Sequence, residues 1–308
     1  MSGGDRLTAG VAQMNLSRRE WLALAATAPL AQAKGYAPRL ACQTYIFEQD
    51  YGKRKQKTLD HADEIFAILH EAGYRAVELT SNFFPPEKTA DTLALLDQHG
   101  LALPIAYIGG PMHNDASKQT VETALAYAER LKPHKGLEAI SFNCDPKPGH
   151  ASKTDAELAT EAQALEQLGS ALTRMKLRLL VHQHAPEMAD HAREWRYFVK
   201  NTTARNVGIC MDTHWTLRGG EDVMQILREA GKRIGDVHLR NSKDGVWLEE
   251  LAGGDLDYGA VAAELKKNDY RGWLTVELAW DPTTKITRPL SANLKRSREF
   301  AERLFDVK

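Results

Sequence analysis

The chain has 308 residues, a formal net charge of -1, 43% hydrophobic residues and 26% charged residues. The near-zero charge argues against a protein that binds the nucleic-acid backbone, because such domains usually carry a strong basic excess. The ordinary balance of apolar and charged residues excludes a largely disordered chain and indicates a globular protein, with room for one large barrel or two smaller domains.

The N-terminal residues have the features of a twin-arginine export signal. Two consecutive arginines precede residues 21–33, which carry no charge, and Ala31 and Ala33 form the small-residue pattern of a cleavage site. The uncharged run is too short for a bilayer span of about 20 helical residues. An amphipathic helix is the alternative, but the run has no polar face. We therefore predict an export signal at 1–33, a mature domain at 34–308, a periplasmic or secreted location and no permanent membrane span.

The rest of the chain alternates between strand patterns and helix patterns. The predicted strands cover residues 39–45, 75–79, 101–107, 137–143, an apolar run from 177 that ends in histidines at 182 and 184, 207–212, 234–239 and 273–278. The predicted helices cover residues 59–72, 88–99, 115–131, 154–175, a segment through Trp195 and Phe198, 223–230, 258–267 and 290–304.

Eight strand-then-helix units in about 270 residues match the size and order of an α/β protein of the (β/α)8 TIM barrel type. An open doubly wound sheet shows the same alternation. The barrel is favoured because the count is eight and because polar residues gather at the carboxyl ends of strands, where the active sites of such barrels lie. The sequence has no linker rich in proline, glycine or serine after the signal, so we predict a single domain.

The strand that begins near residue 177 ends in His182 and His184, and Glu187 follows after a short turn. On a strand, residues two apart share a face and lie about 7 Å apart. His182 and His184 can therefore address one site. Two histidines near a strand end are equally compatible with a structural role, so the prediction of a site depends on the neighbouring strands.

Three further strands end in residues of the metal-ligand type, Asp212, His238 and Glu277. Such a side chain at the end of an apolar strand is costly to bury unless it is paired or binds a metal. One alone would indicate a structural ion pair, but three on consecutive strands, with His182 on the strand before them, indicate a shared divalent cation. Mixed imidazole and carboxylate ligands suit manganese, zinc, iron or cobalt better than calcium.

The motifs around these residues, MDTHW, VHLRNSKDG and GWLTVELAWDP, resemble the sugar phosphate isomerase/epimerase superfamily of xylose isomerase-like TIM barrels. The segments LACQTYIF, AYIGGPMH and VHQHAPEM resemble a twin-arginine-exported branch of it, so the likeness covers nearly the whole chain after Lys34. The resemblance implies that Asp212, His238 and Glu277 are the last three metal ligands, and that Arg240 meets substrate oxygens.

At His182 the chain departs from the ketose epimerases of this superfamily. Their glutamate at this strand end binds the metal and, with the last glutamate, forms the pair that moves a proton between opposite faces of an enediolate. The imidazole of His182 instead resembles the HxH motif of the inosose dehydratases. The resemblance thus implies the fold and the metal centre but leaves the reaction open.

We predict a divalent-metal-dependent isomerase or epimerase that enolises a keto sugar or related polyol, with His184, Glu187 and Glu277 as catalytic groups that transfer protons. A lyase that acts on a keto-inositol or 3-keto-glycoside by β-elimination is the alternative, and a non-catalytic sugar-binding barrel is a remote one. A nuclease similar to endonuclease IV is disfavoured, because that family needs additional histidine and aspartate ligands and export removes the protein from DNA. The predicted substrate contacts are Glu78, His214, Trp215 and Arg240.

Overall fold

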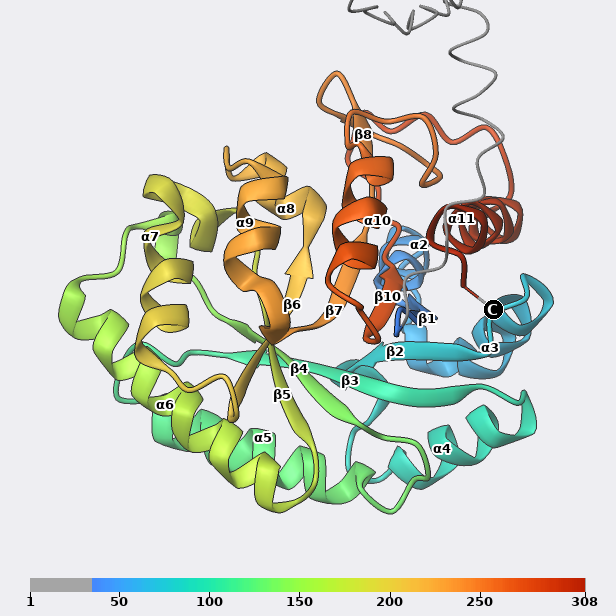
Figure 1. Ribbon diagram of the computed structural model, residues 1–308. Coiled ribbons are helices and arrows are strands. Elements are labelled where there is room, and N and C mark those ends of the chain that lie inside the picture. Colours follow the sequence, from blue (N-terminus) through green and yellow to red (C-terminus); the bar gives the residue numbers. More distant parts are fainter. Residues whose placement is uncertain (1–34, 308) are drawn as a thin grey trace, which may run out of the picture. The chain divides into compact units, whose positions relative to one another are not determined.

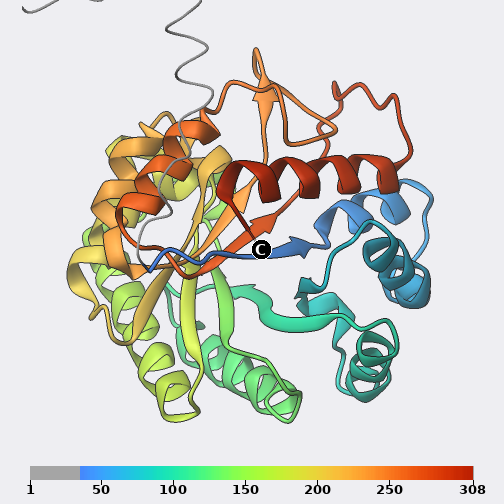
Figure 2. The same ribbon diagram turned by 45° about the vertical axis from the view of Figure 1, so that its right-hand side comes forward.

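Eight parallel strands close into a barrel with helices around its outside (Figures 1 and 2). The computed structural model describes residues 35–307 of the chain. Each barrel strand pairs with the next barrel strand along the chain, and β1 pairs with β10 to close the barrel. The predicted (β/α)8 barrel is confirmed. The predicted export signal at 1–33 lies outside the described residues.

The barrel strands begin and end close to their predicted positions. They are β1 (Arg39–Gln43), β2 (Ala76–Thr80), β3 (Ala102–Gly110), β4 (Ala139–Cys144), β5 (Arg178–His182), β6 (Val207–Asp212), β7 (Ile234–Leu239) and β10 (Trp273–Val276). β3 is longer than predicted because Gly109 and Gly110 stay paired with Asn143 and Cys144 of β4. A Cβ atom on Gly109 would lie 2.9 Å from the carbonyl oxygen of Asn143, so this close approach requires glycine.

The helices follow the strands in alternation. They are α2 (Tyr45–Lys53), α3 (Ala62–Glu71), α4 (Thr89–Gln98), α5 (Ser117–Leu131), α6 (Asp155–Arg174), α7 (Ala185–Asn201), α8 (Thr213–Arg218), α9 (Val223–Ala230), α10 (Tyr258–Lys267) and α11 (Leu290–Phe305). Short 3-10 helices cover η1 (Thr58–His61), η2 (Ser81–Phe83), η3 (Pro148–His150) and η4 (Gly231–Arg233). The sequence did not predict α2 or α8. Among the helices of residues 35–307, none combines the length and apolar character needed to cross a membrane.

The barrel interior contains both apolar and charged side chains. Ile105, Leu180 and Cys210 form part of a buried apolar cluster. Glu78 on β2 and Asp236 on β7 are also fully buried. The interior of a TIM barrel is usually filled with branched apolar side chains, and a buried carboxylate is costly unless it has partners. These two carboxylates therefore indicate a role beyond packing.

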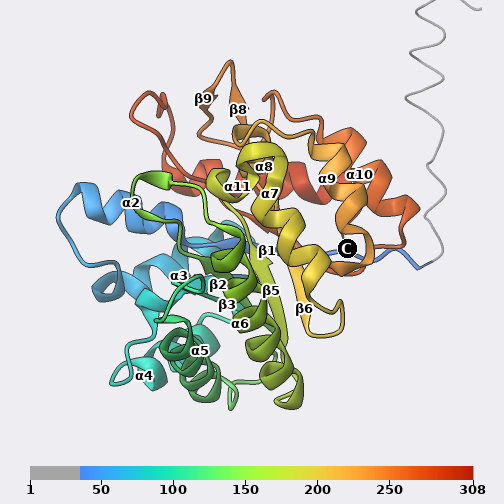
Figure 3. The same cartoon turned by 90° about the vertical axis from the view of Figure 1, so that its left-hand side faces the viewer.

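A short β-hairpin follows the carboxyl end of β7. Its strands, β8 (Ser242–Lys243) and β9 (Val246–Trp247), pair in antiparallel fashion. The backbone N–H of Trp247 donates to Asp281 Oδ2 at 3.2 Å, which ties the hairpin to the loop after β10. Figure 3 shows the hairpin beyond the ends of the barrel strands, near α8. The hairpin thus brings an aromatic side chain to the mouth of the barrel.

Candidate functional site

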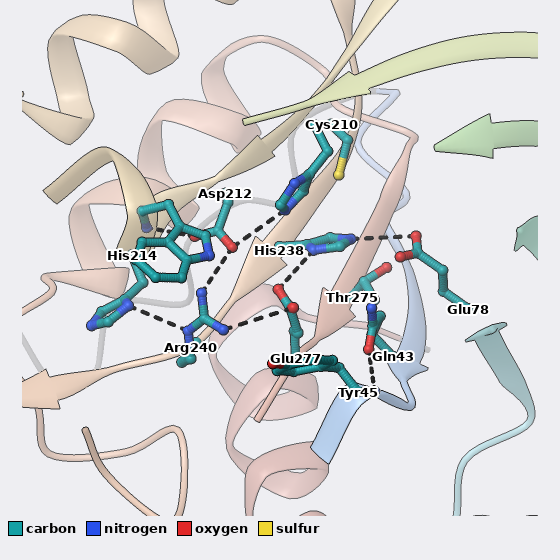
Figure 4. Close-up of polar contacts among 12 residues, drawn as sticks. Gln43, Tyr45, Glu78, Cys210, Asp212, His214, His238, Arg240, Thr275 and Glu277 are labelled. Carbon is teal, nitrogen blue, oxygen red and sulfur yellow. Dashed lines mark hydrogen bonds and ion pairs between the residues drawn. The ribbon is translucent and has the colours of Figure 1, made fainter. Parts of the chain in front are cut away.

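Four potential metal ligands converge at the carboxyl ends of four neighbouring strands. His182 ends β5, Asp212 ends β6, His238 is the last residue but one of β7, and Glu277 follows β10. Their ligand atoms all lie within 4.8 Å of one another, and all four side chains are buried. Figure 4 shows Asp212, His238 and Glu277 close together inside the barrel. The structure therefore brings together the four residues that the sequence predicted as ligands.

Strand register produces this convergence. Asp212 pairs with His238 across β6 and β7. The backbone N–H of Glu277 donates to the carbonyl oxygen of Leu239 at 3.0 Å, which extends the pairing of β10 with β7 as far as the glutamate. His238 Nδ1 consequently lies 2.9 Å from Glu277 Oε2. Backbone hydrogen bonds between neighbouring strands thus hold Asp212, His238 and Glu277 side by side near the carboxyl end of the barrel.

The donor atoms fit a divalent cation. His182 Nδ1 lies 3.4 Å from Asn143 Oδ1, which suits a ring that is protonated on Nδ1. Its Nε2 is buried without a hydrogen-bond partner in the described residues and faces Asp212 Oδ2 at 3.5 Å. An unpartnered buried nitrogen is costly, whereas a metal ligand needs a free lone pair in this position. Two imidazoles and two carboxylates form a set typical of manganese, zinc, iron or cobalt.

Arg240 keeps the two ligand carboxylates ionised. Its buried guanidinium lies 3.2 Å from Asp212 Oδ2 and 3.7 Å from Glu277 Oε1. Burial alone would raise the pKa of Asp212, but the Arg240 charge outweighs burial and holds it well below its usual range. The pKa of Glu277 is lowered by the same balance of burial against Arg240 and His238. Both groups are therefore available as anionic ligands.

Two tryptophans form an aromatic wall beside the four potential metal ligands His182, Asp212, His238 and Glu277, which are called the ligand set below. The Arg240 guanidinium lies over the rings of Trp215 on α8 and Trp247 on β9, at 5.0 Å and 4.6 Å from the ring centroids. The two indoles meet edge to face with centroids 5.4 Å apart. Both tryptophans are half-buried, and the His184 ring lies 5.3 Å from that of Trp215. Such a wall offers an apolar face to the C–H side of a ligand ring next to charged groups.

Most of the chain matches one known protein family. Residues 66–304 match the family described as xylose isomerase-like TIM barrel. The chain belongs to this family.

Relatives of this xylose isomerase-like barrel include inosose dehydratases. The inosose dehydratase of Geobacillus kaustophilus is 26% identical over 275 residues, which cover 79% of this chain and 87% of the relative. That of Mesomycoplasma hyopneumoniae is 24% identical over 247 residues, which cover 71% and 82%.

Solved structures with the same fold include sugar epimerases. The structure of L-ribulose 3-epimerase aligns with a TM-score of 0.70 at 16% identity and covers 87% of this chain and 95% of its own. The structure of D-allulose 3-epimerase from Methylomonas sp. in complex with D-allulose aligns with a TM-score of 0.69 at 18% identity, covering 88% and 100%. At these identities the likeness supports the fold.

His184 and His214, predicted as a catalytic group and a substrate contact, both lie next to the ligand set. Burial and then His182 lower the pKa of His184 to about 3, while burial and then Arg240 lower the pKa of His214 to about 4. Both imidazoles are therefore uncharged at neutral pH. His214 is fully buried, whereas His184 is half-buried, so His184 is the more accessible to a substrate.

Two residues at the barrel mouth were not among the predicted site residues, although Tyr45 stood at a predicted strand end and Trp247 was a candidate for stacking on a sugar ring. Tyr45, the first residue of α2, is 40% exposed and lies beside Glu277 in Figure 4. Its position after the first strand was the available signal. Trp247 lies on a strand of two residues, which is too short to produce a recognisable pattern. Both side chains extend the surface that a substrate would meet.

Glu78 does not lie where the sequence predicted a substrate contact. It is 0% exposed, in the middle of β2 rather than at its end, and its Oε2 lies 3.3 Å from His238 Nε2. Its polar contact is with His238, one of the potential metal ligands, and not with a group at the open mouth of the barrel. The structure therefore places Glu78 behind His238.

Glu187 also differs from its predicted place among the groups that transfer protons. Its Oε2 accepts a hydrogen bond from the backbone N–H of His184 at 2.7 Å, which caps the start of α7. Burial and then Glu194 raise the pKa of Glu187 to about 7, and Lys153 is also close enough to act on it. Glu187 thus belongs to a separate buried cluster with Lys153, Glu161 and Glu194.

Proposed function

We propose that this protein is a divalent-metal-dependent lyase that acts by β-elimination, removing water from a keto-inositol or the aglycone alcohol from a 3-keto-glycoside. The observation that carries the proposal is the pair His182 and His184, which stands where a two-glutamate epimerase would need a carboxylate. The relatives named inosose dehydratase, which align with most of the chain, support the same reaction class.

The ligand set supports this chemistry. His182, Asp212, His238 and Glu277 would hold the cation, which we propose to be manganese, zinc, cobalt or iron. When bound, the ion would polarise a substrate carbonyl and stabilise negative charge on its oxygen. Arg240 supplies a further positive charge on the same side of the site. These groups would favour loss of a proton from the carbon next to the carbonyl.

His184 is the proposed proton acceptor. Both nitrogens of the neighbouring His182 have assigned roles, one toward Asn143 and one toward the ligand set, so His182 is not free to move a proton. The His184 ring lies 4.7 Å from that of His182 and is half-buried, which places an imidazole at the edge of the site. A positioned imidazole is a common general base, and the lowered pKa of His184 leaves its lone pair free at neutral pH. The same low pKa makes the free ring a weak base, so the negative charges of Asp212 and Glu277 nearby are needed to stabilise the imidazolium that forms.

Isomerisation or epimerisation is the second candidate. It begins with the same proton loss and differs only in the next step. The enediolate is either protonated again, or it breaks the C–O bond at the β-carbon, and the oxygen then leaves as water or alcohol by taking the proton that His184 had accepted. The observation in its favour is Glu277 Oε1, which lies 3.7 Å from Arg240 and faces the same space. An ionised carboxylate there can first accept a proton from the substrate and then return it to a neighbouring carbon.

An assay of the metal-loaded protein distinguishes the two reactions. With a keto-inositol we expect a product that has lost one water, and with a 3-keto-glycoside we expect release of the aglycone alcohol. Mass spectrometry detects the loss, and ultraviolet absorption detects the conjugated enone in the remaining ring. A chelator should stop the reaction, and added manganese, cobalt or zinc should restore it. Solvent deuterium in an isomeric product without loss of water would contradict the lyase and support the second candidate.

Export by the twin-arginine route is a separate proposal and rests on the sequence of residues 1–33. We expect the protein from a periplasmic fraction to begin near Lys34, as determined by N-terminal sequencing. Replacement of Arg18 and Arg19 with lysine should keep the precursor in the cytoplasm. Intact Met1 on the periplasmic protein would contradict cleavage.

A further inference from the structure

Two carboxylates lie inside the barrel directly behind the metal ligands. Glu78 on β2 and Asp236 on β7 have no exposed surface, and Thr275 on β10 is buried with them. Asp236 is held in place, because Oδ1 accepts from the Val237 N–H at 2.8 Å and from Thr275 Oγ1 at 2.9 Å. Glu78 has a different environment, since its Oε1 has no hydrogen-bond partner among the described residues.

His238 joins these carboxylates to the ligand set. Its Nδ1 lies 2.9 Å from Glu277 Oε2, and its Nε2 lies 3.3 Å from Glu78 Oε2 (Figure 4). Asp236 Oδ2 is also 3.3 Å from Nε2, but only the contact with Glu78 has the geometry of a hydrogen bond. The two ring nitrogens therefore face in two directions, one toward the proposed cation and one into the closed barrel.

A neutral imidazole carries one proton, so only one of its nitrogens can bind a metal. A histidine ligand usually donates its other N–H to a carboxylate or carbonyl group, which fixes the tautomer and the ring orientation. Here the acceptor in that position is Glu78. His182 shows the same division, with Nδ1 toward Asn143 and Nε2 toward the ligand set.

We propose that Glu78 is a positioning residue, which accepts the Nε2–H of His238 and thereby turns Nδ1 toward the cation. This inference rests on the proposed metal centre and replaces the substrate role that the sequence suggested for Glu78. It also explains why a fully buried carboxylate lies against His238 inside the barrel. Asp236 Oδ2 lies near the same nitrogen at 3.3 Å without hydrogen-bond geometry.

The test compares Glu78→Met with Glu78→Gln in zinc binding, measured by titration calorimetry against a competing chelator. Glu78→Met removes the acceptor and should weaken zinc binding by about 10–100-fold. Glu78→Gln keeps an oxygen that accepts the N–H and should lose less affinity. Glu249→Gln neutralises a buried glutamate that binds Thr287 and lies outside the barrel interior, and it should bind zinc as the wild type does.

Two further measurements separate positioning from damage to the fold. Glu78→Met removes a buried oxygen without a partner but leaves the Nε2–H of His238 without its acceptor, so we expect a cooperatively folded protein with at most a modest loss in unfolding temperature. The nitrogen chemical shifts of His238 in zinc-loaded protein should show a proton on Nε2 in the wild type and a changed pattern in Glu78→Met.

Normal zinc affinity in Glu78→Met, or equal losses in the Met and Gln variants, would overturn the inference and leave the metal centre intact. Failure of the wild type to bind any divalent cation would instead overturn the proposed function.

Discussion

Asp212→Asn is expected to weaken binding of a divalent cation by more than about 100-fold, beyond the range typical of outer-sphere partners, and to abolish turnover. Asp212 Oδ2 faces both His182 Nε2 and Arg240, so its charge stands at the centre of the ligand set. Asparagine keeps the size of the side chain but supplies only a neutral oxygen. The measurement is metal content after dialysis, with affinity from calorimetry.

The variant has a matched control elsewhere in the chain. Asp212 Oδ1 also caps α8 by accepting the N–H of Trp215 at 2.7 Å. Asp222 caps α9 in the same way, through the N–H of Met224 at 2.8 Å, and takes no part in the ligand set. Asp222→Asn should keep full metal affinity and activity. If Asp212→Asn keeps the cation and the activity as well, the assignment of the metal centre fails.

The ligand set was predictable because each member ends a recognisable apolar strand. A buried apolar strand such as residues 207–212 ends in a carboxylate only at a cost in free energy, unless that carboxylate has a partner. Barrel topology then brings the ends of successive strands to one face, so spacing along the chain did not need to be known. The fold followed from the same alternation of strand and helix patterns.

The depth of Glu78 inside the barrel and the capping role of Glu187 were not predictable from the alternation of strand and helix patterns. The second strand was expected to end at Leu79 but ends at Thr80, which leaves Glu78 in mid-strand. Glu187 stands three residues after His184, a spacing typical of helix capping, and the structure uses it in that way. The buried state of Lys153 had no sequence signal, because lysines are almost always exposed.

Above about pH 8, Lys153→Met is expected to lower the free energy of unfolding by about 3–5 kcal/mol, the usual cost of leaving a buried charge without a partner. The Lys153 Nζ atom lies 2.6 Å from Glu161 Oε2 and 2.7 Å from Glu194 Oε1, and the lysine side chain is 2% exposed. Glu187 and Glu194 of this cluster lie on either side of the break in α7, where three consecutive residues, 190–192, adopt left-handed backbone angles. Such angles persist only where surrounding contacts enforce them. Denaturant unfolding measures the loss.

The pH dependence of the free energy of unfolding lost in Lys153→Met tests whether the loss is electrostatic. Burial and then Glu194 raise the pKa of Glu161 to about 8. A raised pKa means that the folded state holds this proton more tightly, so the stability from Glu161 is present at low pH and falls as pH rises through about 8. The deficit of Lys153→Met should therefore be largest above about pH 8 and shrink toward about pH 5. Lys147→Met removes a half-exposed lysine paired with Glu157 and should have a much smaller effect, because exposed ion pairs contribute little. A deficit that does not change with pH would indicate lost packing as the cause.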